Sequence, residues 1–436
     1  MSFNKQTIRE LNLHNKTVLL RADYNVPLSS TGKITDDFRI TQSLPTIKYL
    51  LEKNVKLIIC SHLGRPSGPN DSKFSLKVVG DKLRKLLEPH KVIFSGNCIG
   101  LDVQNAAKNL EPGQVLLLEN LRFHKEEEDN NKDFAKSLAS LADVFVQDGF
   151  GVVHRAHAST DAITKYLPSV SGLLLENEVD SITNVMENPK RPLSAIIGGA
   201  KIADKIDLIK KFIEIADFVA IGGAMANTFL KAKNLDIAHS VYDKDELGLA
   251  RDIMDKAQDK IKKGSFSFFL PQDAVVAKNL TSLASTRIVD WSTHTVADIE
   301  SYPKQPSSDN FKIMKDEMIL DIGPFSSAYI AGAMQLSGTV VWNGTMGVTE
   351  TPGLQGPIGP FARGSEIVIE AIVGDFGHRP YSLVGGGDTT GYLENRKLLD
   401  SFDHVSTGGG ASLELMAGRK LPGVEALLNK QEKARV

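Results

Sequence analysis

The sequence has few cysteines and no long apolar run, and each absence excludes a class of protein. The chain has 436 residues, of which only Cys60 and Cys98 are cysteine. Two cysteines cannot build the disulfide framework of a small secreted domain, and their lack of CxxC spacing argues against a zinc site. No apolar stretch is long enough to span a bilayer, and the polar N-terminus lacks an apolar signal core. We therefore expect buried, inert thiols, a reducing cytoplasm and no membrane partner.

The chain also lacks an excess of charge of either sign. Its 51 Lys and Arg nearly balance 53 Asp and Glu, for a net charge of −2. This balance gives no electrostatic reason to expect a nucleic-acid partner. The length exceeds the size at which single hydrophobic cores usually stop growing, so two domains are expected.

Two common nucleotide-binding motifs are missing as well. The stretch IIGGAKIADKI (196–206) runs from an apolar strand through two glycines toward a helix. Such a turn aims backbone N–H groups at an anion, yet it fits neither GxxxxGK[ST] nor GxGxxG. The missing GxGxxG counts against a dinucleotide-dependent dehydrogenase, which glycine-rich strand ends would otherwise suggest. The stretch leaves open whose phosphate it would hold.

Short apolar runs alternate with helical stretches along the whole chain. The predicted strands span residues 17–22, 55–60, 91–96, 115–120, 144–148, 193–199, 218–223, 267–272, 318–323, 339–344 and 382–388. Continuous apolar strands between helices indicate α/β architecture, with parallel sheets covered on both faces. Thr35 is the predicted N-cap of a helix that runs to about residue 53. A long helix is predicted within 167–192, ended by the Asn188–Pro189 pair, as a connector between two sheets.

The predicted strands of the first half end in cationic and polar residues. These are Asp23, Asn25, His62, Arg65, Arg122 and Arg155, with Arg39 one turn into the following helix. Arginine presents a planar fork that matches phosphate and carboxylate oxygens, so a shared sheet edge would suit a small, multiply anionic metabolite. Taken singly, a strand-end arginine is more often a surface ion pair. Arg122, for example, could pair with the acidic run 126–129.

The predicted strands of the second half end mostly in glycine. The turns VGGGDTT (384–390) and STGGGAS (406–412) offer backbone amides to phosphates near helix starts. Asp388 could serve Mg²⁺, which prefers one or two carboxylates with waters and phosphate oxygens. Lys201 and Lys205 are predicted on one helical face, pointing at a phosphate chain. A glycine pair is often only a tight turn, and a helical lysine is often only solvated, but several such turns in one half indicate a polyanion site.

The two halves together point to phosphoryl transfer between an acid and a Mg-nucleotide. No side chain stands out as a dedicated general base. An acceptor carboxylate would need none, since it is already deprotonated at neutral pH. Catalysis would then consist of positioning and charge neutralisation, with water excluded by closure of the two halves.

These motifs, taken together, resemble those of the phosphoglycerate kinases over essentially the full length of the chain. The matching stretches are RADYNVPL, ITDDFRI, SHLGRP, ENLRFHKEEE, GVVHRAHAST, GGAKIADKI, IGGAMANTF, VWNGTMGVTE, VGGGDTT, HVSTGGGASLEL and LPGVEAL, in the order of that family. The resemblance implies a monomer of two doubly wound, Rossmann-like domains joined by a helical hinge. It implies a 3-phosphoglycerate domain at 1–172, a hinge at 173–190 and a Mg-nucleotide domain at 191–414. It also implies that residues from about 415 to 436 pack back on the first domain.

The resemblance assigns roles to individual residues. The acid site would comprise Asp23, Asn25, Arg39, His62, Arg65, Arg122 and Arg155. The nucleotide site would comprise Lys201, Lys205, Asn343, Glu350, Gly386, Gly387, Asp388 and Thr389, with Asp388 on Mg²⁺ and Gly409 and Gly410 in a second amide nest. Catalysis would fall to Arg39, Lys201, Gly387 and Gly410, in transfer between 1,3-bisphosphoglycerate plus ADP and 3-phosphoglycerate plus ATP.

The chain departs from the family pattern at a few positions. Asp36 and Asp37 stand where asparagines are common, which adds negative charge beside Arg39. Thr345 and Thr349 stand where proline and phenylalanine are common, which is expected to loosen a nucleotide loop. A catalytically silent protein that keeps the fold and the ligands is therefore the alternative to an active kinase.

Overall fold

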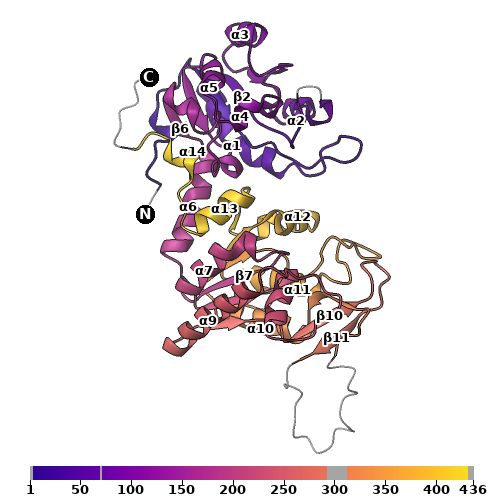
Figure 1. Ribbon diagram of the computed structural model, residues 1–436. Coiled ribbons are helices and arrows are strands. Elements are labelled where there is room, and N and C mark those ends of the chain that lie inside the picture. Colours follow the sequence, from indigo (N-terminus) through magenta and orange to yellow (C-terminus); the bar gives the residue numbers. More distant parts are fainter. Residues whose placement is uncertain (1–2, 69–70, 292–311, 431–436) are drawn as a thin grey trace, which may run out of the picture. The chain divides into compact units, whose positions relative to one another are not determined.

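The chain divides into two compact units, as a computed structural model that describes residues 3–68, 71–291 and 312–430 shows. The first unit comprises residues up to Asn184 together with those from Thr407 onward, and the second comprises Val185–Ser406. Each unit is built on one six-stranded sheet (Figure 1). The α/β architecture with two parallel sheets is thereby confirmed, whereas the domain bounds at 172, 190 and 414 stay predictions.

The sheet of the first unit has the order β3-β4-β2-β1-β5-β6, and all its pairings are parallel. Its strands are β1 (Thr17–Arg21), β2 (Lys56–Cys60), β3 (Val92–Phe94), β4 (Val115–Leu117), β5 (Val144–Gln147) and β6 (Ser169–Ser171). Its helices are α1 (Phe38–Glu52), α2 (Lys77–Leu86), α3 (Leu101–Lys108), α4 (Lys125–Glu128), α5 (Lys132–Ala139), α13 (Gly409–Met416) and α14 (Pro422–Glu425). The chain leaves β1 toward β2 on one side and returns to β5 on the other. The crevice between β1 and β5 is thus the switch point where ligands bind in such sheets.

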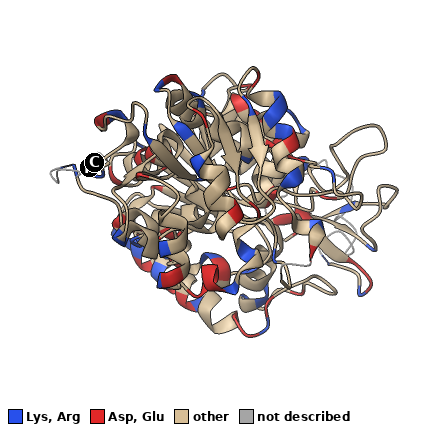
Figure 2. Ribbon diagram, turned by 90° about the horizontal axis from the view of Figure 1, so that it is seen from above, with Lys and Arg blue, Asp and Glu red and all other residues tan. Residues whose placement is uncertain are grey.

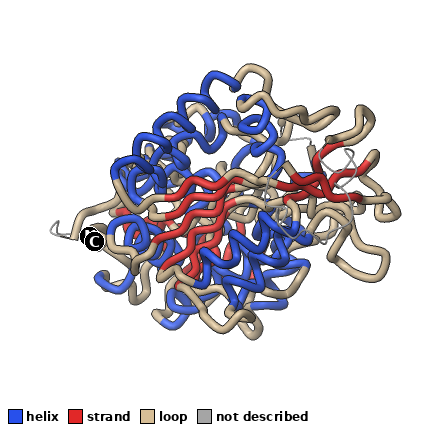
Figure 3. The backbone as a smooth tube through the Cα atoms, turned by 90° about the horizontal axis from the view of Figure 1, so that it is seen from below, coloured by secondary structure: helices blue, strands red, loops and turns tan. Residues whose placement is uncertain are grey.

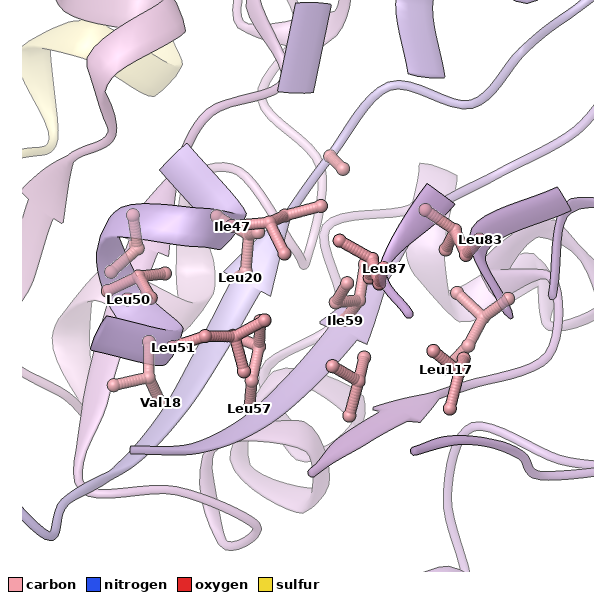
Figure 4. Packing of buried hydrophobic residues seen from close by; sticks show 14 of the residues in the cluster. Val18, Leu20, Ile47, Leu50, Leu51, Leu57, Ile59, Leu83, Leu87 and Leu117 are labelled. Carbon is pink, nitrogen blue, oxygen red and sulfur yellow. The ribbon is translucent and has the colours of Figure 1, made fainter. Parts of the chain in front are cut away.

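Alternation along the strands gives the first unit a core on each face of its sheet. Val18 and Leu20 of β1 pack into one apolar cluster, and Leu19 between them packs into the other. Figure 4 shows Ile47 and Leu50 of α1 directed onto the β1 side of the first cluster. Burying each such side chain contributes about 1.5–3 kcal/mol, so the period of two in the strand sequence fixes which face each residue covers.

The sheet of the second unit has the order β15-β14-β13-β7-β8-β9, again parallel throughout. Its strands are β7 (Leu193–Ile197), β8 (Phe218–Ile221), β9 (Ser267–Phe269), β13 (Thr339–Asn343), β14 (Tyr381–Gly385) and β15 (His404–Val405). Its helices are α7 (Ile206–Ile215), α8 (Gly223–Ala232), α9 (Leu247–Lys263), α10 (Pro324–Gln335), α11 (Arg363–Val373) and α12 (Gly387–Asn395). Figure 3 shows helices on both sides of the strands. The switch point here lies between β7 and β13.

A third, antiparallel sheet belongs to the second unit and was not predicted. It has the order β11-β10-β12, with β10 (Asp273–Ala277), β11 (Arg287–Asp290) and β12 (Met318–Ile322). The strand predicted at 318–323 is therefore real, but it does not join the parallel sheet. A short apolar run specifies a buried strand and leaves its partner and direction open. The short strands β6 and β15 were also missed.

Two helix starts differ from their predictions. The helix predicted after Thr35 begins at Phe38, because the Thr35 hydroxyl donates to the carbonyl of Pro27 at 3.2 Å instead of capping a helix. The predicted connector becomes α6 (Leu173–Glu187), and the residues before it form β6. The division between the two units falls within α6.

The charge and cysteine predictions can be compared with the structure. Figure 2 shows acidic and basic residues interspersed on the helices. Cys60 and Cys98 are both free and buried, and burial raises the pKa of the Cys60 thiol to about 12 and raises that of Cys98 as well. Both therefore stay protonated and unreactive, as expected. Within the described ranges, no helix combines the length and apolarity needed to cross a membrane.

Candidate functional site

The first unit places an acidic residue and an arginine together just beyond β1. Arg39 Nη1 lies 3.1 Å from Asp23 Oδ2 and donates to the carbonyl of Asn25, also at 3.1 Å. The Asn25 side-chain oxygen accepts the N–H of Gly64 at 2.8 Å, which ties the ends of β1 and β2 together. Burial alone would raise the pKa of Asp23, but the charge of Arg39 and the hydrogen bond from the Asn25 N–H outweigh it, and the pKa is lowered. Asp23 is therefore an ionised acceptor, suited to a hydroxyl group.

His62 is held as a neutral ring by its surroundings. Burial lowers the pKa of His62 well below its usual range; Asp23 opposes this, and the charges of Arg21, Arg122 and Arg39 add to it. The His62 Nδ1 atom lies 3.4 Å from Arg21 Nη2. Since a guanidinium can only donate, Nδ1 accepts and the proton resides on Nε2. His62 therefore offers one N–H donor to a ligand.

Arg21 is a buried arginine that the sequence reasoning did not single out. Only 1% of it is exposed. Its Nε donates to Ser159 Oγ at 2.7 Å, and the same hydroxyl donates to Glu127 Oε1 at 2.5 Å. The signal was available, because Arg21 is the one charged residue in the otherwise apolar strand TVLLR. Its charge contributes to the field of the site without being exposed to a ligand.

The three remaining predicted arginines behave differently from one another. Arg65 and Arg155 are exposed, and Arg155 Nε donates to His154 Nε2 at 3.1 Å. Arg122 Nε pairs with Glu128 Oε1 at 3.0 Å, and Nη1 donates to the Gly64 carbonyl at 2.9 Å. The predicted ion pair between Arg122 and the acidic run 126–129 is thus present, with Glu128 as the partner.

The pKa of His157 shows that these arginines act on a common region. Burial first, and then the charges of Arg21, Arg122 and Arg155, lower the pKa of His157 to about 4. The ring therefore remains neutral at neutral pH. The arginines add a positive field to the effect of burial, and such a field favours an anionic ligand.

The two unusual aspartates near Arg39 have structural partners. Asp37 forms an ion pair with Lys82 of α2. Asp36 Oδ1 accepts the N–H of Phe38 at 2.8 Å, at the start of α1. The charge of Asp37 is therefore partly offset by Lys82.

In the second unit, the ends of β7 and β13 approach closely at the switch point. The N–H of Gly198 donates to the carbonyl of Asn343 at 3.0 Å. A Cβ atom on Gly198 would lie 2.1 Å from the carbonyl oxygen of Thr345, so only glycine permits this approach. The glycine at the start of GGAKIADK is therefore required by the close approach of the loop that carries Thr345.

Lys205 lies beneath this turn and is anchored to backbone. Its Nζ donates to the carbonyls of Gly198 at 2.8 Å and Asn343 at 3.0 Å. Burial lowers its pKa to about 8, against the opposing charge of Asp388. The prediction that Lys201 and Lys205 share a helical face is wrong, because Lys205 closes a 3₁₀ turn (Ala203–Lys205) that Lys201 precedes. The side chain of Lys201 is exposed.

The start of α12 forms the other wall of the switch point. Gly386 has φ +95°, a conformation that other residues adopt only with strain. Thr389 is buried, and its hydroxyl accepts the N–H of Gly344 at 2.8 Å, while Asp388 is exposed. Neither polar atom of the Asn343 side chain has a partner in the described structure, although the residue is only 1% exposed. A buried amide without partners indicates a ligand position.

A pocket of about 140 Å³ adjoins these residues. Its lining includes Gly199, Gly223, Leu320, Met346, Glu350 and Asp388. The wall is largely small and apolar, and three carboxylates line it: Asp321, Glu350 and Asp388. This composition suits a flat apolar ring system that carries polar and charged extensions.

The glycine-rich segment before α13 lies in the first unit. Thr407 donates its N–H and its hydroxyl to Glu178 Oε1, at 2.6 and 2.7 Å. A Cβ atom on Gly410 would lie 3.2 Å from His154 Nε2. Gly410 therefore lies beside His154, to which Arg155 donates, whereas Lys201 and Gly387 lie in the second unit.

The chain is similar in sequence and in structure to known proteins of one family. A family model described as phosphoglycerate kinase matches residues 8–419. A phosphoglycerate kinase of Koribacter versatilis is 44% identical over 98% of this chain and 100% of its own length, and a cytosolic phosphoglycerate kinase of Triticum aestivum is 43% identical over 97% of each. The structure of phosphoglycerate kinase from Coxiella burnetii is similar with a TM-score of 0.78 and 36% identity, covering 97% of this chain and 98% of that one. That from Pyrococcus horikoshii is similar with a TM-score of 0.80 and 28% identity over the same shares. The two parallel sheets, their glycine-rich and arginine-rich strand ends and these matches together show that the chain belongs to the phosphoglycerate kinase family.

Proposed function

We propose that this chain catalyses the reaction of its family, and that the two sites described above divide the substrates between them. That reaction is the reversible phosphoryl transfer between 1,3-bisphosphoglycerate plus ADP and 3-phosphoglycerate plus ATP, in glycolysis and gluconeogenesis. The observation that carries the proposal is the buried, unpartnered Asn343 amide beside the Gly386 turn. It marks a polar ligand position at the switch point of a sheet whose neighbouring pocket fits a nucleoside.

The first unit binds the acid. Arg65 and Arg155 are exposed and hold the phosphate, with Arg122 adding charge from its place against Glu128. His62 donates its Nε2–H to an anionic oxygen. Asp23 accepts from the hydroxyl of the glycerate, and Asn25 fixes the geometry through Gly64. Each charge-assisted hydrogen bond of this kind contributes about 1.5–3 kcal/mol.

The second unit binds the nucleotide. The pocket takes the nucleoside, Glu350 accepts from ribose hydroxyls, and the turn at Gly386 and Gly387 presents N–H groups to phosphates. Asp388 stands exposed at this turn, which fits Mg²⁺, since that ion is usually bound by one or two carboxylates together with waters and phosphate oxygens. The described part of the chain has no cluster of three or more metal-ligating side chains, in keeping with a cation that arrives with its nucleotide. When bound, Mg²⁺ neutralises charge on the phosphate oxygens.

Transfer requires no general base, because the acceptor carboxylate is already ionised. The carboxylate oxygen of 3-phosphoglycerate attacks the terminal phosphorus in line, and the bond to ADP breaks. Arg39 and Lys201 neutralise the charge of the transferring group, and the N–H groups of Gly387 and Gly410, near the starts of α12 and α13, donate to its oxygens. Lys205, anchored at the same turn, adds positive charge.

The two ligands must meet with water excluded, so we also propose closure of the two domains about the hinge when both are bound. X-ray scattering tests this step, since the radius of gyration should shrink only with both substrates present. We further propose that the protein acts as a monomer in the cytoplasm.

The deciding experiment measures ATP consumption with 3-phosphoglycerate and Mg²⁺ against a control that lacks the acid. Acid-dependent turnover that EDTA abolishes is the expected result. Binding of both ligands with no turnover would instead identify a silent binding protein. In that case the departures at Asp36, Asp37, Thr345 and Thr349 would be examined first.

A further inference from the structure

The first turn of α11 contacts three separate walls of the nucleotide site through three consecutive residues. The N–H of Gly364 donates to Asp321 Oδ2 of β12 at 2.8 Å. Ser365 Oγ accepts the N–H of Met346, in the loop after β13, at 2.9 Å. Asp321 and Met346 both line the pocket. The third residue, Glu366, faces α12.

Glu366 is a buried carboxylate with a dense set of partners. It is 3% exposed, and Arg396 donates to it in a fork, from Nε to Oε1 at 2.8 Å and from Nη2 to Oε2 at 2.9 Å. The Tyr392 hydroxyl donates to Oε1 at 2.5 Å. Burial first, and then the hydrogen bond to Glu366, raise the pKa of Tyr392, so this hydroxyl keeps its proton and remains a donor. Tyr392 lies in the last turn of α12, and Arg396 is the C-cap residue of that helix.

The two ends of α12 are thus held by different parts of the site. Its last turn is held by Glu366, whereas near its first turn Thr389 accepts the N–H of Gly344 at 2.8 Å. Because α12 is one continuous helix of 9 residues, holding its last turn also restrains the direction of its first turn. The first turn of α12 carries Gly387 and Asp388, which the proposed function assigns to phosphates and Mg²⁺.

We propose that Glu366 is a positioning residue for nucleotide binding, which aims the N-terminus of α12 at the phosphate chain through its fork with Arg396. The inference rests on the proposed function. Glu366 contacts no ligand in this scheme. Its effect reaches the nucleotide only through the direction of α12 and through its two neighbours in the first turn of α11.

The test compares Glu366→Gln with a matched control on the same helix. Gln keeps the volume but loses the charge that holds the fork. Glu370→Gln is the control, because Glu370 pairs with Arg363 on α11 at 2.8 Å in an exposed ion pair away from the pocket. Calorimetric titration with MgADP measures the dissociation constant, and steady-state kinetics measure the KM for each substrate.

We expect Glu366→Gln to raise the dissociation constant of MgADP about tenfold, with the KM for 3-phosphoglycerate unchanged. Glu370→Gln should match the wild type. Arg396→Gln should resemble Glu366→Gln, and the double variant should be no worse than either, because both changes remove one interaction. A merely structural role would lower stability without separating the two substrates.

Two outcomes overturn the inference: unchanged MgADP affinity in Glu366→Gln, or equal losses for both substrates. If that variant does not fold, Tyr392→Phe decides, since it removes one hydrogen bond and keeps the packing. Its MgADP affinity should then fall by about two- to fivefold, and no change would refute the role. A wild-type protein that binds no MgADP would instead refute the proposed function, which is a separate result.

Discussion

The two proposed sites differ in the groups that they offer to an anion. In the first unit, the proposed recognition depends on side chains at strand ends, and several of these are already paired: Arg39 with Asp23, and Arg122 with Glu128. In the second unit, the proposed recognition depends on backbone N–H groups that glycine turns expose, and the Asn343 side chain has no partner within the described structure. Recognition by side chains tolerates small changes in the backbone, but it requires particular residue types at the positions that contact the anion. Backbone recognition requires glycine at single positions and tolerates changes elsewhere.

The largest expected effect comes from removing a cation in the first unit. Arg39→Ala should lower kcat about 10²–10³-fold while weakening 3-phosphoglycerate binding far less, because its charge is proposed to act on the transferring group. Steady-state kinetics with both substrates varied measure the split. Arg84→Ala, at a partly exposed arginine of α2, serves as the control. A loss that appears only in KM would contradict a transition-state role.

The next effect concerns backbone recognition in the second unit. Gly386→Ala should weaken nucleotide binding about tenfold or more, since φ is +95° and the new Cβ would lie 3.2 Å from Asn343 Oδ1. Gly391→Ala on the same helix is the control, because a Cβ there meets open space. That change should leave binding intact and stabilise α12 by up to about 1 kcal/mol. Equal nucleotide affinity in the two variants would contradict the proposal that the second unit binds its anion through the backbone of the Gly386 turn.

A smaller expected effect is the uptake of protons by the protein when the nucleotide binds. Burial lowers the pKa of Lys205 to about 8 from an ordinary value of 10.5. Between these values the unfolded chain binds a proton that the folded chain lacks, so the stability contribution of this group rises with pH across that window. A bound phosphate favours the charged lysine and raises its pKa. MgADP binding near pH 8.5 should therefore take up a fraction of a proton.

Calorimetry in buffers of different ionisation enthalpy measures this uptake. Lys205→Met should abolish it. Uptake that persists in this variant would assign the proton to another group and leave Lys205 as a purely structural anchor.

The smallest expected effect tests the unusual aspartates. Lys82→Met leaves Asp37 without its partner near the start of α1. The affinity for 3-phosphoglycerate should fall about two- to threefold, because partly exposed ion pairs contribute only about 0.2–1 kcal/mol. The double variant Lys82→Met/Asp37→Asn should recover the affinity, and high salt should diminish the effect. An unchanged affinity in the single variant would show that Asp37 does not act on the acid site.

The residues at the strand ends could be predicted to lie close together, because parallel strands bring their carboxyl ends to one edge of a sheet. This reasoning found the arginines of the first unit and the glycines of the second. It missed Arg21, which is hidden in an apolar strand, and Glu366, which lies in an ordinary helical pattern. It also placed the strand at 318–323 in the wrong sheet.

The sequence by itself determined the period of strands and helices, the two-unit α/β architecture and the chemistry present at the strand ends. Only the tertiary structure decided which groups are paired and which are left without partners. The Thr389 hydroxyl joins an N–H 45 positions away, and Glu366 joins Arg396 across 30. Local patterns record the conformation of a segment, whereas such contacts depend on how segments far apart in the chain pack together. That packing leaves the buried side chain of Asn343 without a partner among the described residues, whereas Lys205 donates to two backbone carbonyls.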